Sequence, residues 1–504
     1  PSAVPDTYWS RLSPFIADAM GLHFPRERWP DLERGLAGAA QEFGFGDVTA
    51  CADWLLSSPV TKAQLQVLAS HLTIGETYFF RDKQMLGALS EHILPELIRS
   101  RRGREQRLRI WSAACCSGEE PYSLAILLHQ LLPDLADWHV TILATDINPR
   151  FLHKVAAGIY GEWSFRDAPA ALKESYFTHA ADGRYIVIPE IRELVSFAHL
   201  NLVEDAYPSP VTDTNAMDLI FCRNVLMYFT PPQIENVIGK LRNALVDGGW
   251  LAVSPSEASA ALSSRFVTVN FRGAFLFQKS DATPRTEQRY TPAPLVEIAG
   301  FVAPANETPL PWAPSALPAR RSPVPGLPPE DAAPAEASPA PYAVAESFYR
   351  QGRYAEAADT LVSSFARHAP DPPAFSLLAR ALANQGKLAD ALAWCDRWVA
   401  ADKVDPAAHY LRAVVLLERS EPEPARASLQ RATYLDPDFV LAHFALGNLA
   451  RSRGKDGEAG KHFANARLLL QRYQPGDVLP ESDGLTAGRL AETLSAIADL
   501  EPAP

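Results

Sequence analysis

The sequence predicts a multidomain fold: an N-terminal helical domain, a doubly wound α/β domain and a C-terminal all-α solenoid. The 504 residues suggest about three domains, because single domains average roughly 150 residues. From Leu108 onward, apolar strand-like runs alternate with helical ones, which indicates a parallel sheet covered by helices. Near the C-terminus a 34-residue period recurs, which is typical of stacked helical repeats.

The composition excludes several classes of protein. Hydrophobic residues make up 47% of the chain, so disorder throughout is excluded. The net charge of -12 argues against a nucleic-acid partner, because binding to phosphates depends on clustered lysine and arginine. No apolar run is long enough for membrane insertion, and no secretory signal is recognisable. The five cysteines lack metal-type spacing, so we expect a cytoplasmic protein without a bound metal.

The first two domains are predicted from apolar periodicity. Helical spacing up to about residue 70, as in TKAQLQVLASHL, predicts a helical domain over 1–70. The α/β domain is expected over 71–282. Its strands are predicted in RLRIWSAACC, HVTILATDI, AMDLIFCRN and GWLAVSP, with helices in EPYSLAILLHQLL and PPQIENVIGKLRNAL. Such sheets bind ligands at the carboxyl ends of their strands.

The C-terminal half begins with a proline-rich stretch and continues with repeats. Fifteen of the 43 prolines lie between Pro284 and Pro341, so 283–341 is interpreted as a linker rather than as a docking motif. Beyond it, positions 352, 386, 420 and 454 stand 34 residues apart in turn-like contexts, with small residues at fixed distances on both sides. This period resembles the tetratricopeptide repeat. We expect four repeats over 342–471 that bind a protein partner, then a capping helix and tail over 472–504.

The turns after the first two strands carry the first chemical signals. In IWSAACCSGEEPY, small residues let a cofactor approach the backbone, while Glu119 and Glu120 disfavour a phosphate. A cationic cofactor such as S-adenosylmethionine fits better; an ordinary tight turn is the alternative. Asp146 ends the second strand, where a carboxylate can accept hydrogen bonds from ribose hydroxyls. Capping of the helix that begins at Pro149 is the alternative role for Asp146.

Successive motifs along residues 8–280 then give a family resemblance. They are LTIGETYFFRD, WSAACCSGEEPYSLAI, ATDIN, GIY and FCRNVLMYF. In this order and at these distances they resemble the motifs of CheR-type chemoreceptor glutamate methyltransferases. The resemblance implies a Rossmann-like methyltransferase domain over 71–282. In that family S-adenosyl-L-methionine methylates receptor glutamates to glutamyl methyl esters, leaving S-adenosyl-L-homocysteine and adapting a chemosensory pathway.

The resemblance also implies roles for individual residues. Cofactor-binding roles fall on Thr77, Arg81, Glu120, Asp146, Asn201, Leu202, Arg223 and Asn224. A substrate glutamate is already ionised at neutral pH, because its pKa is ~4.3, so no general base is required. Catalysis then depends on in-line positioning in a site that excludes water. Arg81 and Tyr228 are the catalytic candidates that would hold the glutamate; a structural core aromatic is the alternative for Tyr228.

Two places depart from the family pattern. Gly75 stands where the family usually has asparagine, so that cofactor contact is lost or is made by the backbone. Cys115 and Cys116 replace small polar residues. We interpret them as space-fillers rather than as a redox pair, because adjacent cysteines bond only with strain.

The regions that would meet the substrate are predicted from the same resemblance. A small β insert is expected at about 163–200, with a closing hairpin over 182–200. Docking of a receptor peptide and a purely structural flap both fit this insert. The methyl-accepting chemoreceptor would face Arg26, Arg28 and Arg34 of the helical domain. Recruitment to membrane receptor arrays stays open.

Two alternative functions stay open at this stage. The first is a cofactor-binding scaffold or regulator with weak or no methyl transfer, which only the Gly75 departure supports. The second is methylation of nucleic acid or a small molecule. It fits less well, because CRNV at 222–225 differs from the DPPY-like tetrapeptide that is common in base methyltransferases.

Overall fold

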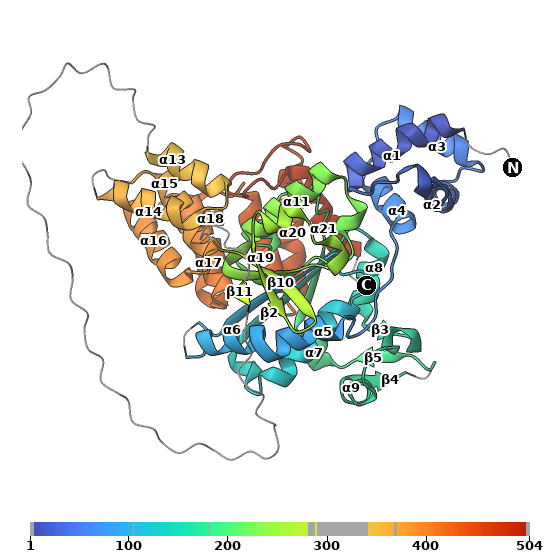
Figure 1. Cartoon of the computed structure of the whole chain (residues 1–504). Helices are drawn as coiled ribbons and strands as arrows, with labels where there is room; N and C mark the ends of the chain where they lie inside the picture. Colours follow the sequence, from blue (N-terminus) through green and yellow to red (C-terminus); the bar gives the residue numbers. More distant parts are fainter. Residues whose placement is uncertain are drawn as a thin grey trace, which may run out of the picture.

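The computed structural model describes residues 5–103, 105–180, 182–280, 288–289, 341–366 and 370–499. Figure 1 shows N-terminal helices in dark blue, a sheet body in light blue to green, and C-terminal helices in orange to red. This architecture confirms the expected fold class. The expected linker lies outside the described residues, apart from 288–289 and 341. Among the helices of the described part, none combines the length and the apolar character that a bilayer crossing demands.

The N-terminal body consists of helices. They are α1 (Asp6–Met20), α2 (Trp29–Glu42), α3 (Val48–Ser57) and α4 (Lys62–Leu72). Asp47 starts α3 by accepting a hydrogen bond from the Ala50 amide, and Thr61 and Gln64 start α4 with a reciprocal capping box. Apolar side chains from all four helices form one core, so this body folds around its own interior.

The main sheet has the strand order β11-β9-β10-β8-β7-β1-β2-β6. Its strands are β1 (Arg107–Ala113), β2 (His139–Asp146), β6 (Val195–His199), β7 (Met217–Phe221), β8 (Leu245–Ala252), β9 (Val267–Phe271), β10 (Ala274–Gln278) and β11 (Gln288–Arg289). The strands from β8 to β6 run parallel, whereas β10 is antiparallel to both its neighbours. The strand order reverses at β1, which is where doubly wound sheets place their ligands.

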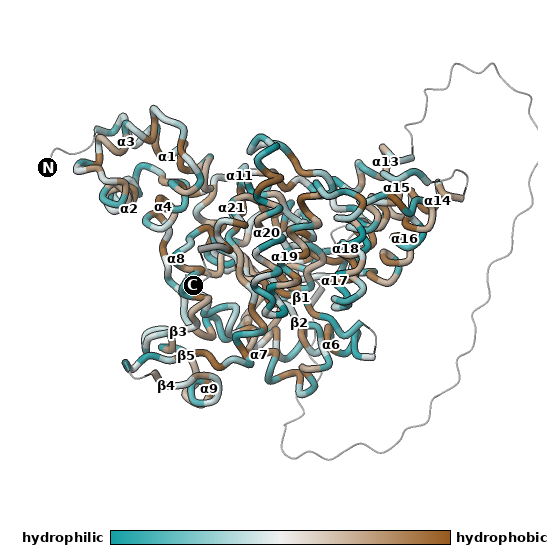
Figure 2. The backbone as a smooth tube through the Cα atoms, turned by 180° about the vertical axis from the view of Figure 1, so that it is seen from behind, coloured by the Kyte–Doolittle hydropathy of each residue, from teal (hydrophilic) through white to brown (hydrophobic). Residues whose placement is uncertain are grey.

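Helices cover both faces of this sheet, so β1 is buried along its whole length. One face carries α5 (Lys83–Ala88), α6 (Leu94–Arg101), α7 (Glu119–Leu131) and α8 (Pro149–Ala157), and the other carries α11 (Pro231–Ala244) and α12 (Ala260–Ser263). Leu108 and Ile110 of β1 enter the first core, and Trp111 and Ala113 enter the second. Apolar segments, brown in Figure 2, run through this central body.

A small antiparallel sheet lies apart from the main one, beside α9 (Ala170–Tyr176) in Figure 1. Its strands, in order, are β3 (Ile159–Tyr160), β5 (Tyr185–Val187) and β4 (Phe177–His179). The expected closing hairpin over 182–200 is wrong. After β5 the chain turns through α10 (Pro189–Arg192), and β6 then joins the main sheet parallel to β2. Pro189 favours a helical turn there, and the buried Val195 packs in the main core.

The C-terminal body is a solenoid of antiparallel helix pairs. They are α13 (Pro341–Arg350) with α14 (Tyr354–Phe365), α15 (Pro372–Asn384) with α16 (Leu388–Ala401), α17 (Pro406–Glu418) with α18 (Pro422–Leu435), and α19 (Val440–Arg451) with α20 (Asp456–Leu470). At Gly352, Gly386, Ser420 and Gly454 the φ angles are 71, 73, 59 and 66°. The 34-residue period therefore repeats one left-handed turn, which glycine adopts without strain.

The solenoid packs against the sheet body. Glu418, at the end of α17, accepts a hydrogen bond from Asn215 at 3.0 Å and pairs with Arg107 of β1 at 3.3 Å. The Glu418 and Arg107 side chains are only 7% and 10% exposed. After the solenoid, α21 (Ala487–Asp499) lies against the turn that follows β6. The two bodies thus share a buried polar interface.

Candidate active site

A cleft opens at the carboxyl ends of β1, β2 and β7. It is lined by the end of α1, the loop 72–81, the turn between β1 and α7, the turn after β6 and the loop 223–229. The structure brings all the predicted site residues to this cleft: Thr77, Arg81, Glu120, Asp146, Asn201, Leu202, Arg223, Asn224 and Tyr228. The sheet topology explains this convergence, because parallel strands end at one edge.

The turn between β1 and α7 forms one wall of the cleft. Ala114 and Cys116 have φ angles of 62° and 52°, and Gly118 has a φ of 95°. Left-handed backbone at residues with a Cβ is strained, and such strain concentrates at ligand sites. Burial raises the pKa of the Cys116 thiol to about 12 and that of Cys115 well above its ordinary value. Both thiols are free and protonated, which fits their interpretation as space-fillers.

Asp146, the last residue of β2, presents a carboxylate to the cleft. It is 6% exposed and accepts backbone hydrogen bonds from Cys116 at 2.9 Å and Asn148 at 2.8 Å. Burial raises the pKa of Asp146 to about 6, and the backbone hydrogen bonds oppose that rise. The alternative role as a helix cap is wrong, because Asn148 caps α8 by accepting a hydrogen bond from the Arg150 amide at 2.9 Å.

Glu120 and Arg223 place opposite charges side by side in the cleft. Glu120 accepts a hydrogen bond from Ser112 at 2.7 Å, and its carboxylate lies 3.6 Å from the Arg223 guanidinium. Arg223 also donates to Asp82 at 2.8 Å. Burial raises the pKa of Glu120, while Arg223 acts against that rise. A partly buried carboxylate beside a buried guanidinium suits a ligand that carries both an ammonium and a carboxylate group.

Thr77 and Arg81 come from the loop between α4 and α5. Arg81 donates from Nη1 to the carbonyl of Glu76 at 2.8 Å, and its guanidinium lies 5.6 Å from the centre of the Tyr78 ring. These neutral groups hold Arg81 at the cleft without neutralising it. Burial raises the pKa of the nearby Glu120 carboxyl, and the positive charge of Arg81 acts against that rise. Arg81 also lines the cleft that a substrate carboxylate would enter.

The departure at Gly75 has a structural reason. A Cβ at this position would lie 2.6 Å from Cζ of Phe151 and 3.4 Å from Sγ of Cys116. Phe151 projects from α8 and lines the cleft. Its ring therefore occupies the space that an asparagine side chain at position 75 would need.

Glu257 is a residue of this region that sequence reasoning missed. It is 7% exposed and accepts hydrogen bonds from the amides of Asn224 at 2.8 Å, Val225 at 2.7 Å and Ser254 at 3.0 Å. Asn224 has a left-handed φ of 58°, so the loop 223–228 depends on this anchor. The sequence signal was the capping-box pattern SPSE, which the structure shows as reciprocal bonds between Ser254 and Glu257.

Tyr228 links the cleft to the N-terminal body. Its carbonyl accepts a hydrogen bond from the His23 amide at 2.7 Å, and the Arg28 guanidinium lies 5.3 Å from its ring centre. Arg28 also lines the cleft. Of the other two arginines expected to face the receptor, Arg26 pairs with Asp6 and Arg34 with Asp31, both at exposed positions outside the cleft lining.

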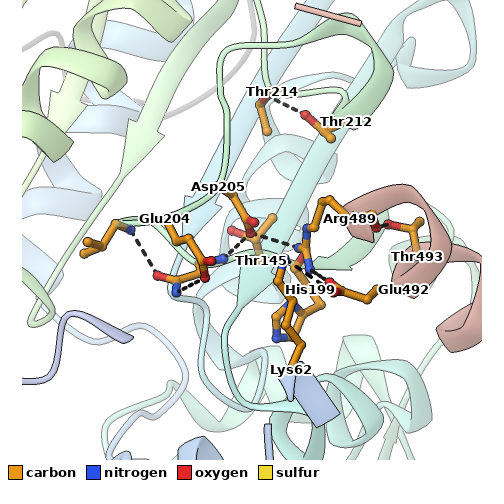
Figure 3. Close-up of polar contacts among 12 residues, drawn as sticks. Lys62, Thr145, His199, Glu204, Asp205, Thr212, Thr214, Arg489, Glu492 and Thr493 are labelled. Atoms are coloured by element: carbon orange, nitrogen blue, oxygen red, sulfur yellow. Dashed lines mark hydrogen bonds and ion pairs between the residues drawn. The ribbon is translucent and has the colours of Figure 1, made fainter. Parts of the chain in front are cut away.

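The turn after β6 contacts the C-terminal helix, and Figure 3 shows its Asp205 beside Arg489 of that helix. Asn201 donates from its side chain to the Ala19 carbonyl at 3.0 Å, and its amide donates to Asp205 at 2.6 Å. Asp205 in turn pairs with Arg489 of α21 at 2.9 Å. The turn that carries Asn201 and Leu202 is therefore held by α1 on one side and, through Asp205, by α21 on the other. Both residues also line the cleft.

The cleft fits S-adenosylmethionine chemically. Asp146 is a buried carboxylate and Glu120 a partly buried one, no phosphate-binding glycine loop accompanies them, and the strained turn lets a ligand approach the backbone. The fold and this site define the class of S-adenosylmethionine-dependent methyltransferases. Residues 75–274 match the family described as "CheR methyltransferase, SAM binding domain". Residues 348–415 and 410–473 match two tetratricopeptide repeat families, which confirms the expected repeats.

Relatives define the family more narrowly. The chain is 39% identical over 209 residues to chemotaxis protein methyltransferase 2 of Vibrio cholerae, covering 42% of this chain and 71% of that protein. It is 37% identical over 207 residues to a probable chemotaxis protein methyltransferase of Rhizobium etli, covering 40% and 75%. It is 32% identical over 250 residues to the chemotaxis protein methyltransferase of Borreliella burgdorferi, covering 49% and 87%. The chain belongs to the CheR family of chemotaxis protein methyltransferases.

Proposed function

We propose that this protein methylates glutamate side chains of a methyl-accepting chemoreceptor, using S-adenosyl-L-methionine and releasing S-adenosyl-L-homocysteine. The observation that carries the proposal is the shared cleft: a cation, Arg81, and a phenol, Tyr228, line the same cavity as two acids, the partly buried Glu120 and the buried Asp146. The acids suit the cofactor, and the cation suits an anionic substrate. A carboxylate substrate is therefore favoured over a neutral base or a small alcohol.

The cofactor supplies an electrophilic methyl group on a positively charged sulfur. Asp146 would accept hydrogen bonds from the ribose hydroxyls, while Glu120 and Arg223 would bind the amino-acid end. Arg81 and Tyr228 would orient the substrate carboxylate for in-line attack. One carboxylate oxygen forms a bond to the methyl carbon as the bond from carbon to sulfur breaks. No proton is transferred in this step, because the substrate carboxylate is already ionised at neutral pH.

We assign the parts of the chain to this function as follows. The helical region 1–70 would present Arg28 to the acidic receptor surface, and 71–282 would carry out methyl transfer. The solenoid at 342–471 would bind a protein partner. Association with membrane receptor arrays would follow from receptor binding.

Two measurements test the proposal. Titration calorimetry of S-adenosylhomocysteine should give micromolar-range binding that Asp146→Ala removes. Transfer of a radioactive methyl group to a purified receptor cytoplasmic domain should give a base-labile product, as an ester requires. Cofactor binding without transfer to any chemoreceptor domain would instead support the scaffold alternative, with Phe151 against Gly75 as its structural basis.

A further inference from the structure

The inner surface of the solenoid contacts a segment of the same chain. The stretch between α20 and α21 returns to α15, where Arg380 pairs with both Glu481 and Asp483; the Asp483 carboxylate lies 2.6 Å from its Nη1. Ser376 donates to Glu481 at 3.0 Å, and Tyr349 of α13 donates to Asp483 at 3.4 Å. Two consecutive repeats therefore bind two carboxylates of this segment: Tyr349 donates from the first repeat, and Ser376 and Arg380 donate from the second.

This surface is recessed and requires an acidic occupant. The Arg380 side chain is 8% exposed, so loss of both carboxylates would leave a buried and uncompensated charge. Oδ1 of Asn384 is buried and accepts no hydrogen bond within the described part of the chain, although its Nδ2 donates to Tyr349 at 3.0 Å. An extended peptide could supply the missing donor from its backbone.

The segment that occupies the surface is itself strained. Glu481 and Asp483 have left-handed φ angles of 60° and 54°, which residues with a Cβ disfavour. The next residue, Gly484, has a φ of 100°. The Glu481 and Asp483 side chains are 24% and 14% exposed, so solvent reaches the contact. A separate acidic peptide could present its carboxylates without this backbone conformation, but it would have to replace the buried Leu479, Ser482 and Leu485 of the resident segment as well.

We propose that the solenoid surface around Arg380, Ser376 and Tyr349 is a binding site for an acidic segment of a protein partner, and that Glu481 and Asp483 occupy it in the absence of that partner. The proposal rests on the partner-binding role of the solenoid and is independent of methyl transfer. It specifies the chemistry of the partner: two carboxylates separated by one residue, followed by an apolar side chain that replaces the buried Leu485.

The test uses a fluorescein-labelled peptide with the sequence VLPESDGL, taken from residues 478–485, and fluorescence anisotropy with the full-length chain without cofactor. The Glu481→Gln, Asp483→Asn double variant should bind the peptide at least about tenfold more tightly than the wild type, because its own segment no longer competes. Addition of Arg380→Gln to that variant should reduce binding to the wild-type level or below. A control peptide, VLPQSNGL, should bind weakly to every form.

Equal affinity of the wild type and the double variant, or equal binding of both peptides, would overturn the proposal. If the double variant fails to fold, the single Asp483→Asn variant retains one carboxylate on Arg380 and should show a smaller gain in the same direction. Thermal unfolding adds a second readout, since VLPESDGL should raise the Tm of the variant more than that of the wild type. Because no methyl transfer is measured, a negative result here leaves the proposed glutamate methylation intact, and the reverse also holds.

Discussion

Arg489 in the last helix and Asp205 in the turn after β6 form an ion pair at 2.9 Å, 12% and 8% exposed. The same Asp205 carboxylate oxygen accepts the Asn201 amide at 2.6 Å, and Asn201 lines the cofactor cleft. Glu492 of the same helix pairs with Arg489 at 3.1 Å and with Lys62 of the N-terminal body at 3.3 Å (Figure 3). The C-terminal helix thus contacts the turn that carries the cleft residue Asn201, although this helix follows the repeats in the chain.

Arg489→Ala should weaken the binding of S-adenosylhomocysteine by about fivefold, because the Asn201 turn loses a partly buried interaction worth ~1 kcal/mol. Titration calorimetry measures the change. Arg472→Ala is the matched control, since Arg472 pairs with Asp438 at the solvent-exposed surface of the solenoid. Identical Kd values for wild type and Arg489→Ala would show that the C-terminal helix does not support the cleft.

Arg81→Ala should lower kcat/KM for receptor methylation by at least about 30-fold, because a desolvated substrate carboxylate would lose its counter-charge, worth ~2 kcal/mol or more. Arg99→Ala should leave the rate unchanged, since the Arg99 side chain is 78% exposed on α6. Radioactive methyl transfer to the receptor domain measures both variants. Equal activity of the two variants would remove Arg81 from the proposed site.

Gly75→Asn should weaken cofactor binding by about tenfold, because the added side chain forces Phe151 away from the cleft wall and overpacking costs ~1–3 kcal/mol. Gly75→Asn combined with Phe151→Ala should recover the affinity, since the smaller residue at 151 frees the space. Titration calorimetry with S-adenosylhomocysteine measures the affinity of the wild type, the single variant and the double variant. If Gly75→Asn alone binds as well as the wild type, the Phe151 ring is not what prevents a side chain at position 75.

The affinity for S-adenosylhomocysteine should fall as the pH is lowered through about 6. Asp146 has its pKa raised from 3.8 to about 6, so it becomes protonated in this range and loses acceptor capacity for the ribose hydroxyls. Above about pH 7 the carboxylate is ionised, and the affinity should be constant. Calorimetry from pH 5 to 8 measures the affinity at each pH. In the Asp146→Asn variant, the fall in affinity near pH 6 that comes from Asp146 should be absent. A wild-type profile that is flat from pH 5 to 8 would exclude Asp146 as a ligand.

Glu257→Gln should lower the free energy of unfolding by ~1.5–3 kcal/mol and reduce methyl transfer, because the loop 223–228 loses charge-assisted hydrogen bonds to its amides. Urea unfolding and the kcat of receptor methylation measure the two effects. Glu235→Gln on the exposed face of α11 is the control and should change neither. A variant that matches the control in both measurements would mean that the loop is held by other contacts.

The sequence by itself determined what depends on local spacing. Turn-like positions 34 residues apart, with small residues at fixed distances, predicted the repeats, and the structure shows the same left-handed backbone conformation at Gly352, Gly386, Ser420 and Gly454. The strand-turn-helix patterns around Glu120 and Asp146 predicted the cofactor side of the cleft, since parallel strands bring their ends to one edge. Each of these signals is a short segment whose own residues relate to one another through local backbone geometry, and the segments recur or follow one another at regular spacing.

Tertiary structure decided the contacts between residues far apart in the chain. The pairing of Arg380 with Glu481, the Phe151 ring beside Gly75, and the Arg489 contact to Asp205 have no local pattern. The same holds for Val195–His199, which the family resemblance placed in a closing hairpin but which pairs with β2 as the edge strand of the main sheet. The physical reason is that such contacts depend on which surfaces the topology brings together. Where those surfaces are buried, a charged side chain without a partner costs free energy, so paired arrangements are favoured.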